Sequence, residues 1–289
     1  MPSMDPQYLV LVSAEDPVAS RVVERWGTPE ATGWSVDGVP IRRLGDECLV
    51  LRRPGFHIHD ERVDARLPAE LRDRRITLVF PSIHRSEQNI ECLTVHPLGN
   101  PGPEAEVGGR PGTFAPTDPR RMTALLRQLR ERGHEASLGA TFEATHHGPE
   151  VDLPAFFVEI GYGSAAGPSE AAVRILADEI PRIVPEPTDR IALGIGGGHY
   201  APHFTDLAFR RRWAFGHILS RHALATLDAA TARRAWEASE GAEGILYARA
   251  EDAELPALAG IAPRLRDGDA PRGGRSDAAT GASRSASGT

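Results

Sequence analysis

Lysine is absent from this chain of 289 residues, and all 33 basic residues are arginine. With 40 acidic residues the formal net charge is −7 at pH 7, which argues against a protein that coats nucleic acid with its whole surface. Cysteine is scarce too: Cys48 and Cys92 each lie in an apolar segment, so material for a disulfide scaffold or a cysteine zinc site is missing. No run of about 18 apolar residues occurs, and the N-terminus has no basic region followed by an apolar run, so we expect a cytoplasmic protein without a membrane span.

Apolar segments of strand length alternate with amphipathic helical patterns along the chain. This alternation predicts an α/β fold around a mixed or mostly parallel sheet. We expect one domain over residues 1–263 and a disordered tail over 264–289, where large apolar residues are scarce. The predicted strands are 8–13, 48–51, 75–80, 91–96, 136–145, 155–160, 190–194 and 245–248, and the predicted helices are 14–26, 119–132, 170–183 and 215–227.

The stretch 141–161 carries the densest group of titratable residues. His146 and His147 are adjacent and lie between Glu143 and Glu159, with strand-like segments on both sides. Neutral imidazole accepts a proton near pH 7 or binds a metal, and a neighbouring carboxylate orients it. Because Gly148-Pro149 cannot continue a strand, we expect the histidines on a turn at a strand's end.

Three further histidines follow or end predicted strands. His84 comes after 75–80, His96 ends 91–96, and His199 follows the glycine run Gly196–Gly198 after 190–194. One such histidine is more often structural than functional, but repetition at equivalent places predicts a shared cleft. His57 and His59, by contrast, are interpreted as exposed loop residues.

Two chemistries fit these residues. In one, histidines and glutamates hold one or two zinc ions that activate water. In the other, a histidine is the direct base, and backbone amides of the glycine run stabilise an oxyanion. A nucleophilic serine is disfavoured because neither Ser82 nor Ser86 lies in a Gly-x-Ser-x-Gly motif. The residues alone do not separate the two schemes, since no compact ligand pattern fixes a geometry.

Over about residues 8–250 the chain closely resembles the archaeal and plant type of D-aminoacyl-tRNA deacylase. The motifs that carry the resemblance are Ser82-x-His84-x-Ser86, Leu93-Thr94-Val95-His96-x-x-Gly99-Asn100, Phe142-Glu143-Ala144-Thr145-His146-His147-Gly148-Pro149, Phe157-Val158-Glu159-Ile160-Gly161, Gly196-Gly197-Gly198-His199-Tyr200-Ala201-Pro202 and Gly216-His217-Ile218.

The resemblance implies hydrolysis of the ester that joins a D-amino acid to the terminal ribose of tRNA. It also implies zinc as cofactor, and a three-layer sheet-and-helix fold similar to the peptidyl-tRNA hydrolase and nucleoside phosphorylase type. The expected partner is the acceptor end of an aminoacyl-tRNA, bound by a monomer. Two alternatives stay open: a divergent member that acts on another aminoacyl-tRNA or on a small ester or amide, and a non-catalytic tRNA-binding module.

Roles for the candidate residues follow as hypotheses. We expect Glu143, His146, His147 and His199 to be catalytic, and His84, His96 and Glu159 to bind metal. The expected substrate contacts are Ser82, Ser86, Asn100, Gly196, Gly197, Gly198 and Tyr200.

Overall fold

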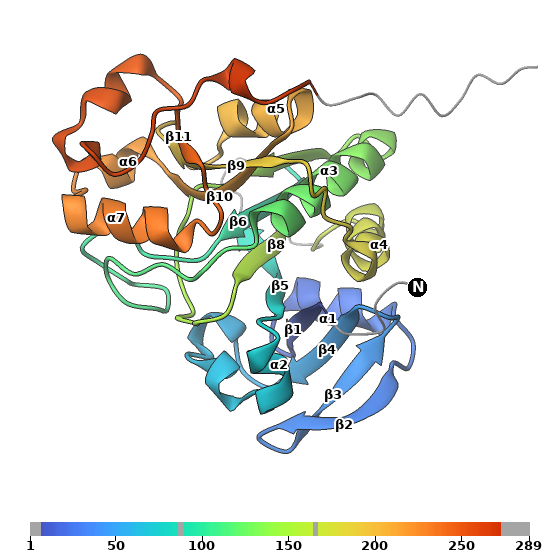
Figure 1. Ribbon diagram of the computed structural model, residues 1–289. Helices are drawn as coiled ribbons and strands as arrows, with labels where there is room; N and C mark the ends of the chain where they lie inside the picture. Colours follow the sequence, from blue (N-terminus) through green and yellow to red (C-terminus); the bar gives the residue numbers. More distant parts are fainter. Residues whose placement is uncertain (1–6, 86–89, 164–166, 273–289) are drawn as a thin grey trace, which may run out of the picture.

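Two sheets make up the framework of the protein. The computed structural model describes residues 7–85, 90–163 and 167–272 (Figure 1). The large sheet has eight strands in the order β2-β3-β4-β1-β5-β8-β6-β7, and the small sheet has three in the order β10-β9-β11. The strands are β1 (Tyr8–Ser13), β2 (Glu30–Val36), β3 (Val39–Leu44), β4 (Cys48–Arg53), β5 (Thr77–Arg85), β6 (Cys92–Pro97), β7 (Gly139–Phe142), β8 (Ala155–Tyr162), β9 (Arg190–Ile195), β10 (Trp213–Leu219) and β11 (Gly244–Tyr247).

Parallel pairs dominate the middle of the large sheet, and antiparallel pairs occur toward its two ends. Strands β4, β1, β5 and β8 run parallel, whereas β6 is antiparallel to β8. The small sheet is parallel throughout. These pairings confirm the predicted α/β class with a mixed sheet, but the division into two sheets was not predicted.

Seven α-helices lie in the described part of the chain. They are α1 (Pro17–Glu24), α2 (Ala69–Asp73), α3 (Pro119–Glu135), α4 (Glu170–Glu179), α5 (Pro202–Arg210), α6 (Arg221–Leu224) and α7 (Ala229–Ala238). Asp118 and Ser169 cap α3 and α4 with their side chains, as the sequence predicts. No helix there is long and apolar enough to cross a membrane.

Alternation along β1 shows how the helices cover the large sheet. Tyr8, Val10 and Val12 pack on one face with α1, α3 and α4, while Leu9 and Leu11 pack on the other face with α2. Short 3₁₀ turns at His57–His59 and Val63–Arg66 complete the cover of the second face. Such burial on both faces explains the continuous apolar runs in the sequence.

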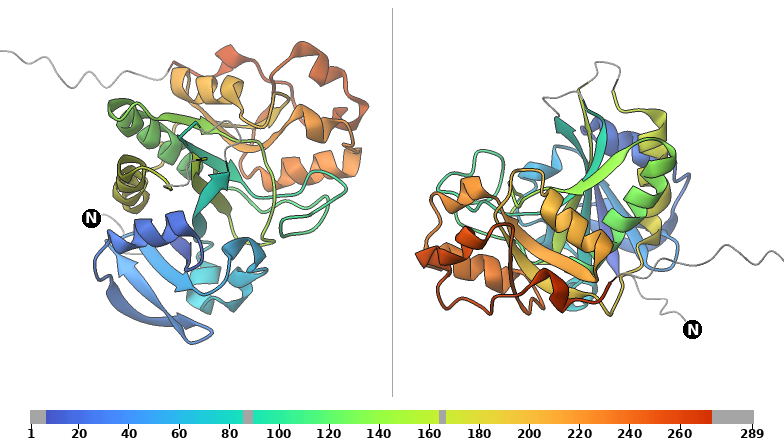
Figure 2. Two further views of the ribbon diagram at one scale, coloured as in Figure 1. Left: turned by 180° about the vertical axis from the view of Figure 1, so that it is seen from behind. Right: turned by 90° about the horizontal axis from the view of Figure 1, so that it is seen from above.

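The small sheet packs α5 on one face and α7 on the other (Figures 1 and 2). Phe215 and Ile218 of β10 share a core with Phe204 of α5 and with α3, so the two sheets belong to one body. The carboxyl ends of β9 and β11 lie together because Ile195 pairs with Tyr247. The glycine run after β9 therefore leaves the sheet beside the segment that follows β11.

Two predictions about elements are wrong. Residues 215–219 belong to β10 rather than to a helix, and only the short α6 follows. Residues 264–272, which the sequence assigns to the tail, pack on the domain: Leu265 N donates to Ile245 O, and Ala270 is buried. Ser86 and the rest of the predicted tail, 273–289, lie outside the described residues.

Candidate active site

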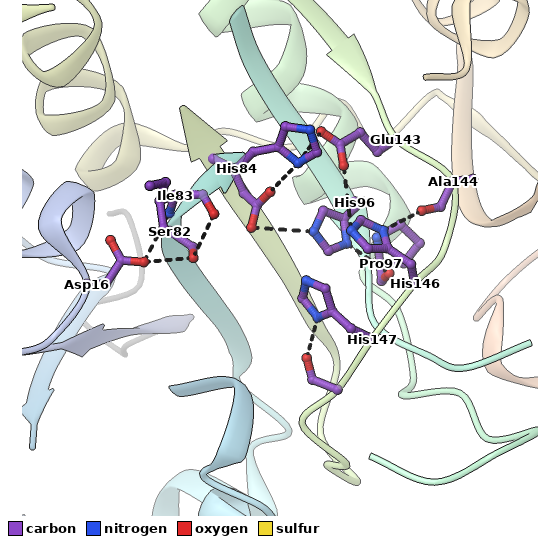
Figure 3. A network of polar contacts seen from close by, with 12 residues as sticks. Asp16, Ser82, Ile83, His84, His96, Pro97, Glu143, Ala144, His146 and His147 are labelled. Atoms are coloured by element: carbon purple, nitrogen blue, oxygen red, sulfur yellow. Dashed lines mark hydrogen bonds and ion pairs between the residues drawn. The ribbon is translucent and has the colours of Figure 1, made fainter. Parts of the chain in front are cut away.

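Three neighbouring strands of the large sheet carry the first part of the site (Figure 3). Glu159 lies on β8, between His84 on β5 and His96 on β6. His84 pairs in register with Gly161, and His96 with Phe157, so both imidazoles are on the same face of the sheet as Glu159. His84 and His96 thus lie within strands, whereas the sequence placed His84 in a loop.

The segment after β7 adds Glu143, His146 and His147. Glu143 N donates to Val95 O, and Thr145 N donates to Ile218 O, so the segment is tied to both sheets. His147 has a left-handed backbone with φ of 44°, a conformation that costs a non-glycine residue energy and recurs at functional sites.

The loop after β9 supplies His199 and Tyr200. His199 Nε2 lies 3.1 Å from Glu143 Oε2, and the Tyr200 hydroxyl hydrogen-bonds to His84 Nε2 at 3.1 Å. His199 is the most exposed member of the cluster, with 44% of its side chain accessible, and 28% of the His146 side chain is accessible. The site therefore opens to solvent on the His199 side.

Glu143 contacts three histidines of the cluster, His199, His84 and His146. Its carboxylate is fully buried, with Oε1 3.4 Å from His84 Nδ1 and Oε2 3.6 Å from His146 Nε2. Glu159 contacts His84 as well, and it also contacts His96. Its Oε2 lies 3.5 Å from His84 Nδ1, and its Oε1 lies 3.7 Å from His96 Nε2. These contacts join six of the seven residues expected to be catalytic or metal-binding. The seventh, His147, packs against His96 and His146, with ring centroids 4.9 and 4.5 Å apart.

Three imidazoles share one hydrogen-bonding arrangement. His146 Nδ1 bonds to Ala144 O at 2.9 Å, His147 Nδ1 to Gly148 O at 2.7 Å, and His96 Nδ1 to Pro97 O at 3.2 Å. A carbonyl only accepts, so each Nδ1 carries the proton, and each neutral ring presents the lone pair of Nε2. Such a backbone bond at the far nitrogen is typical of metal-ligating histidine.

Buried acceptors face one another in this cluster without a donor between them. His96 Nε2 and both oxygens of Glu143 lack a hydrogen-bond partner. Orphaned buried atoms of this kind are costly unless an ion, a water molecule or a proton lies among them. Ligand atoms within 4.8 Å of one another form three groups: His96, His146 and His147; His84, Glu143 and His199; and His96, Glu143 and Glu159.

Burial and charge divide the imidazoles of the cluster: the neutral form is favoured at His146 and His147, and the charged form at His84 and His96, beside an ionised Glu159. Burial and the nearby His96 and His147 hold the pKa of His146 well below its ordinary value, and burial with His96 lowers the pKa of His147 to about 4. Burial alone raises the pKa of Glu159, but His84 and His96 outweigh it and hold that pKa well below its usual range. Burial lowers the pKa of His84 and of His96, but the carboxylates outweigh it and raise both.

Two expected substrate contacts belong to the supporting framework. Ser82 is buried, and its hydroxyl donates to Asp16 Oδ2 at 2.9 Å, which ties β5 to the N-cap of α1. The Asn100 amide donates to Gly108 O at 2.9 Å within the loop that follows β6.

Gly196, Gly197, Gly198 and Tyr200, which are also expected substrate contacts, belong to the loop that carries His199. Gly196 has φ of 100°, and a Cβ there would lie 2.2 Å from Asp252 Oδ2, so its place calls for glycine. Gly197 and Gly198 are half-buried and lead into His199. Tyr200 reaches the cluster through His84.

Two residues of this region were misread or missed. His57 is buried against Phe80 and Phe157 rather than exposed. His217 is buried below the site, where Nε2 donates to Ala115 O at 2.9 Å and Nδ1 lies 3.0 Å from the Thr145 hydroxyl. No local pattern marks these contacts, because each partner is distant in the sequence.

Fold and site together define an α/β protein with a buried histidine–carboxylate cluster. Comparison with known proteins gives the family. The sequence profile of D-aminoacyl-tRNA deacylase matches residues 73–257, and the chain belongs to this family.

Archaeal relatives support the assignment. Proteins named D-aminoacyl-tRNA deacylase are 35% identical in Pyrococcus abyssi, over 71% of this chain and 76% of the relative, and 32% identical in Thermoplasma acidophilum, over 84% and 90%. A relative from Methanosphaerula palustris is 37% identical over 75% of this chain, which spans about half (51%) of that longer protein. A crystal structure of a conserved protein of unknown function shares the fold, with a TM-score of 0.76 and 24% identity over 92% of this chain and 98% of that one.

Proposed function

We propose that this protein hydrolyses the ester bond of a D-aminoacyl-tRNA and releases the free D-amino acid and the tRNA. Membership of the D-aminoacyl-tRNA deacylase family supports this activity. The observation that carries this proposal is the group of His96, His146 and His147, which present Nε2 near the buried Glu143. The exposed His199 lies at the solvent side of this group. An aminoacyl ester is already activated, so one oriented water molecule suffices for its hydrolysis.

The donor set fits a zinc ion. His96, His146 and His147 form a three-histidine group whose Nδ1 atoms are fixed by carbonyls, and the buried His96 Nε2 lacks a partner. Catalytic zinc sites commonly use three protein ligands and keep one position open. Zinc bound there would polarise the ester carbonyl and favour ionisation of water near neutral pH. This division differs from the one expected from sequence, in which His146 and His147 are catalytic and His84 and Glu159 bind metal.

Glu143 and His199 are the proton carriers of the proposed reaction. As water attacks the carbonyl carbon, the Glu143 carboxylate accepts a proton from it. The ester C–O bond to the ribose then breaks, and the ribose oxygen takes up this proton through His199, whose Nε2 lies 3.1 Å from Glu143 Oε2. The Glu143 carboxylate is thereby restored for the next cycle.

Glu159 and His84 position the reacting groups. Glu159 lies between His96 and His84, so its charge holds both rings in place. His84 also binds the Tyr200 hydroxyl and thereby fixes the loop that carries His199.

A binding module without catalysis does not account for this site. Binding to tRNA needs cations and stacking rings more than buried imidazoles. Burying Glu143 and Glu159 beside four histidines costs desolvation free energy, and a catalytic role would explain why the fold retains them.

Release of amino acid from matched D- and L-tyrosyl-tRNA tests the proposal, with metal-stripped and zinc-restored protein side by side. We expect rapid release from the D-substrate that is lost on stripping and recovered with zinc. Release of amino acid by the metal-stripped protein would show that the side chains activate water without zinc. No release from either tRNA would refute the proposal and favour a family member with another acyl substrate.

A further inference from the structure

Two cavities on the small-sheet side of the molecule form a groove lined by arginine. One, of about 490 Å³, lies between α5 and the chain near residue 272, and the other, of about 650 Å³, lies beside the segment after β11. They adjoin, because His203 and Asp267 line both. We call this feature the arginine groove; its arginines are Arg210, Arg211, Arg249, Arg264, Arg266 and Arg272.

The groove is basic on an acidic protein. Six arginines line it against two aspartates, Asp206 and Asp267, whereas the whole chain has a formal charge of −7. Because acidic residues outnumber basic ones elsewhere, a cavity with this excess of positive charge attracts anions selectively.

Several of these arginines have no acidic partner. Arg210 pairs with Asp206, and Arg249 and Arg264 have only long contacts of 3.9 and 4.0 Å to exposed glutamates. Within residues 7–85, 90–163 and 167–272 no ion pair is found for Arg211, Arg266 or Arg272. Arg211 and Arg272 lie side by side, joined by a backbone bridge. Unpaired guanidinium groups in a concave surface suit the oxygens of phosphates.

The groove lies beside the start of the loop that carries His199. His203 stands in the first turn of α5, four positions after His199. Ala248 and Arg249 follow β11, and Ala248 N donates to Ile195 O, beside the start of the glycine run. Tyr247 adds a ring to the groove wall, with the Arg264 guanidinium 5.4 Å above it. Arginines along a path that includes an aromatic ring are typical of surfaces that bind single-stranded nucleic acid.

We propose that the arginine groove binds the phosphate backbone of the tRNA acceptor strand just upstream of the esterified nucleotide. This proposal rests on the proposed function for the identity of the RNA. Phosphates of the strand contact Arg211, Arg266 and Arg272, Tyr247 stacks on a base, and the terminal ribose reaches the histidine cluster past His199.

Binding of uncharged tRNA tests the groove separately from hydrolysis. The triple variant R211Q/R266Q/R272Q removes three charges from the groove, and R211K/R266K/R272K retains them. The matched control R42Q/R52Q/R72Q removes three charges from exposed arginines of the large-sheet half. Dissociation constants are measured by fluorescence anisotropy with labelled tRNA at several salt concentrations, after thermal melts show that each variant is folded.

We expect the groove glutamine variant to bind tRNA at least about tenfold more weakly than wild type. The slope of log K against log salt should become shallower by about 2, since each phosphate contact of a single strand contributes about 0.7. The lysine variant and the distant control should stay within about threefold of wild type. In deacylation the glutamine variant should raise KM by about tenfold and leave kcat within twofold.

Unchanged tRNA affinity in the groove glutamine variant would overturn the proposal, as would an equal loss in the distant control. If wild type binds tRNA through the groove but releases no amino acid from it, the groove proposal stands and the proposed reaction fails. If wild type hydrolyses D-aminoacyl-tRNA and the groove variant retains its KM, the reaction stands and the groove proposal fails.

Discussion

Replacement of His217 by glutamine is expected to remove one component of the acid sensitivity of the fold. His217 is fully buried, and its two ring nitrogens already have partners: Nε2 donates to Ala115 O, and Nδ1 accepts from the Thr145 hydroxyl. A second proton would leave Nδ1 without an acceptor in an apolar surrounding. Burial accordingly lowers the pKa of His217 from 6.5 to about 4.

The direction and size of the effect follow from this lowered pKa. Between pH 6.5 and pH 4 the His217 side chain is protonated in the unfolded chain but remains neutral in the folded chain. The stability due to neutral His217 is therefore fully present above pH 6.5 and is lost as the pH falls toward 4. Integrating the difference gives a loss of about 2 kcal/mol between pH 7.5 and pH 5. Glutamine carries no charge at either pH, and its amide still offers a donor and an acceptor.

Urea unfolding at pH 7.5 and pH 5, in the presence of a chelator, measures the effect. Other buried histidines, such as His57, contribute equally in both proteins, so the quantity of interest is the difference between the pH losses of wild type and variant. We expect the variant to lose about 2 kcal/mol less than wild type. The exposed His222, changed to glutamine, is the control and should leave the loss unaltered. Equal losses in wild type and H217Q would refute the account of His217.

Three further predictions concern residues 143–148, the segment that carries His146 and His147. Glu143→Gln should lower kcat by about 10²–10⁴ because an amide cannot take the proton from water, while zinc content, measured by atomic absorption, stays the same; full activity would exclude Glu143 as the base. Thr145→Val leaves His217 Nδ1 and a backbone N–H without partners, so the free energy of unfolding should fall by about 1–3 kcal/mol per group and kcat more than tenfold, whereas Thr145→Ser should restore both. Gly148→Ala places a Cβ 2.3 Å from a backbone nitrogen of the neighbouring loop and should cost about 1–3 kcal/mol in urea unfolding, whereas Gly102→Ala, which meets nothing within 4 Å, should be tolerated.

The gathering of the histidines was predictable from the sequence. Apolar runs of strand length ended in His84 and His96, and the two strands that carry them flank β8, which bears Glu159. A short run of strand-forming residues between turn signals predicts a strand. Histidines at the ends of several such strands are then expected to meet at one edge of the sheet. The structure brings these residues together, and their roles stay a prediction.

The chemical roles within the cluster were out of reach. They depend on which ring nitrogen of each histidine faces a backbone carbonyl, and for His146 the acceptor is Ala144 O, two residues back around a turn. No residue pattern encodes that ring orientation. The assignment of ligands and bases therefore had to wait for the folded geometry.

Two local features show different kinds of failure. Residues 215–219 form a fully buried strand, and a short apolar run covered on both faces cannot be told from a helix by periodicity alone. The hairpin of β2 and β3, in contrast, turns at Asp37-Gly38, where both residues have positive φ. An Asp-Gly pair between strand-forming residues is a hairpin signal, so this turn can be predicted from the sequence.

Polar residues near the cluster are of two kinds: some have hydrogen-bond partners within the framework, and others have buried atoms without a partner. Ser82 and Asn100 have buried partners in Asp16 and Gly108, so their hydrogen bonds stabilise the framework. Glu143 and His96 have buried atoms without partners, which lowers stability for as long as nothing fills the space between them. Such groups call for a ligand or a role that explains their burial. Unsatisfied burial thus separates Glu143 and His96 from the satisfied Ser82 and Asn100, although the nearby His57 and Thr94 also have buried atoms without partners.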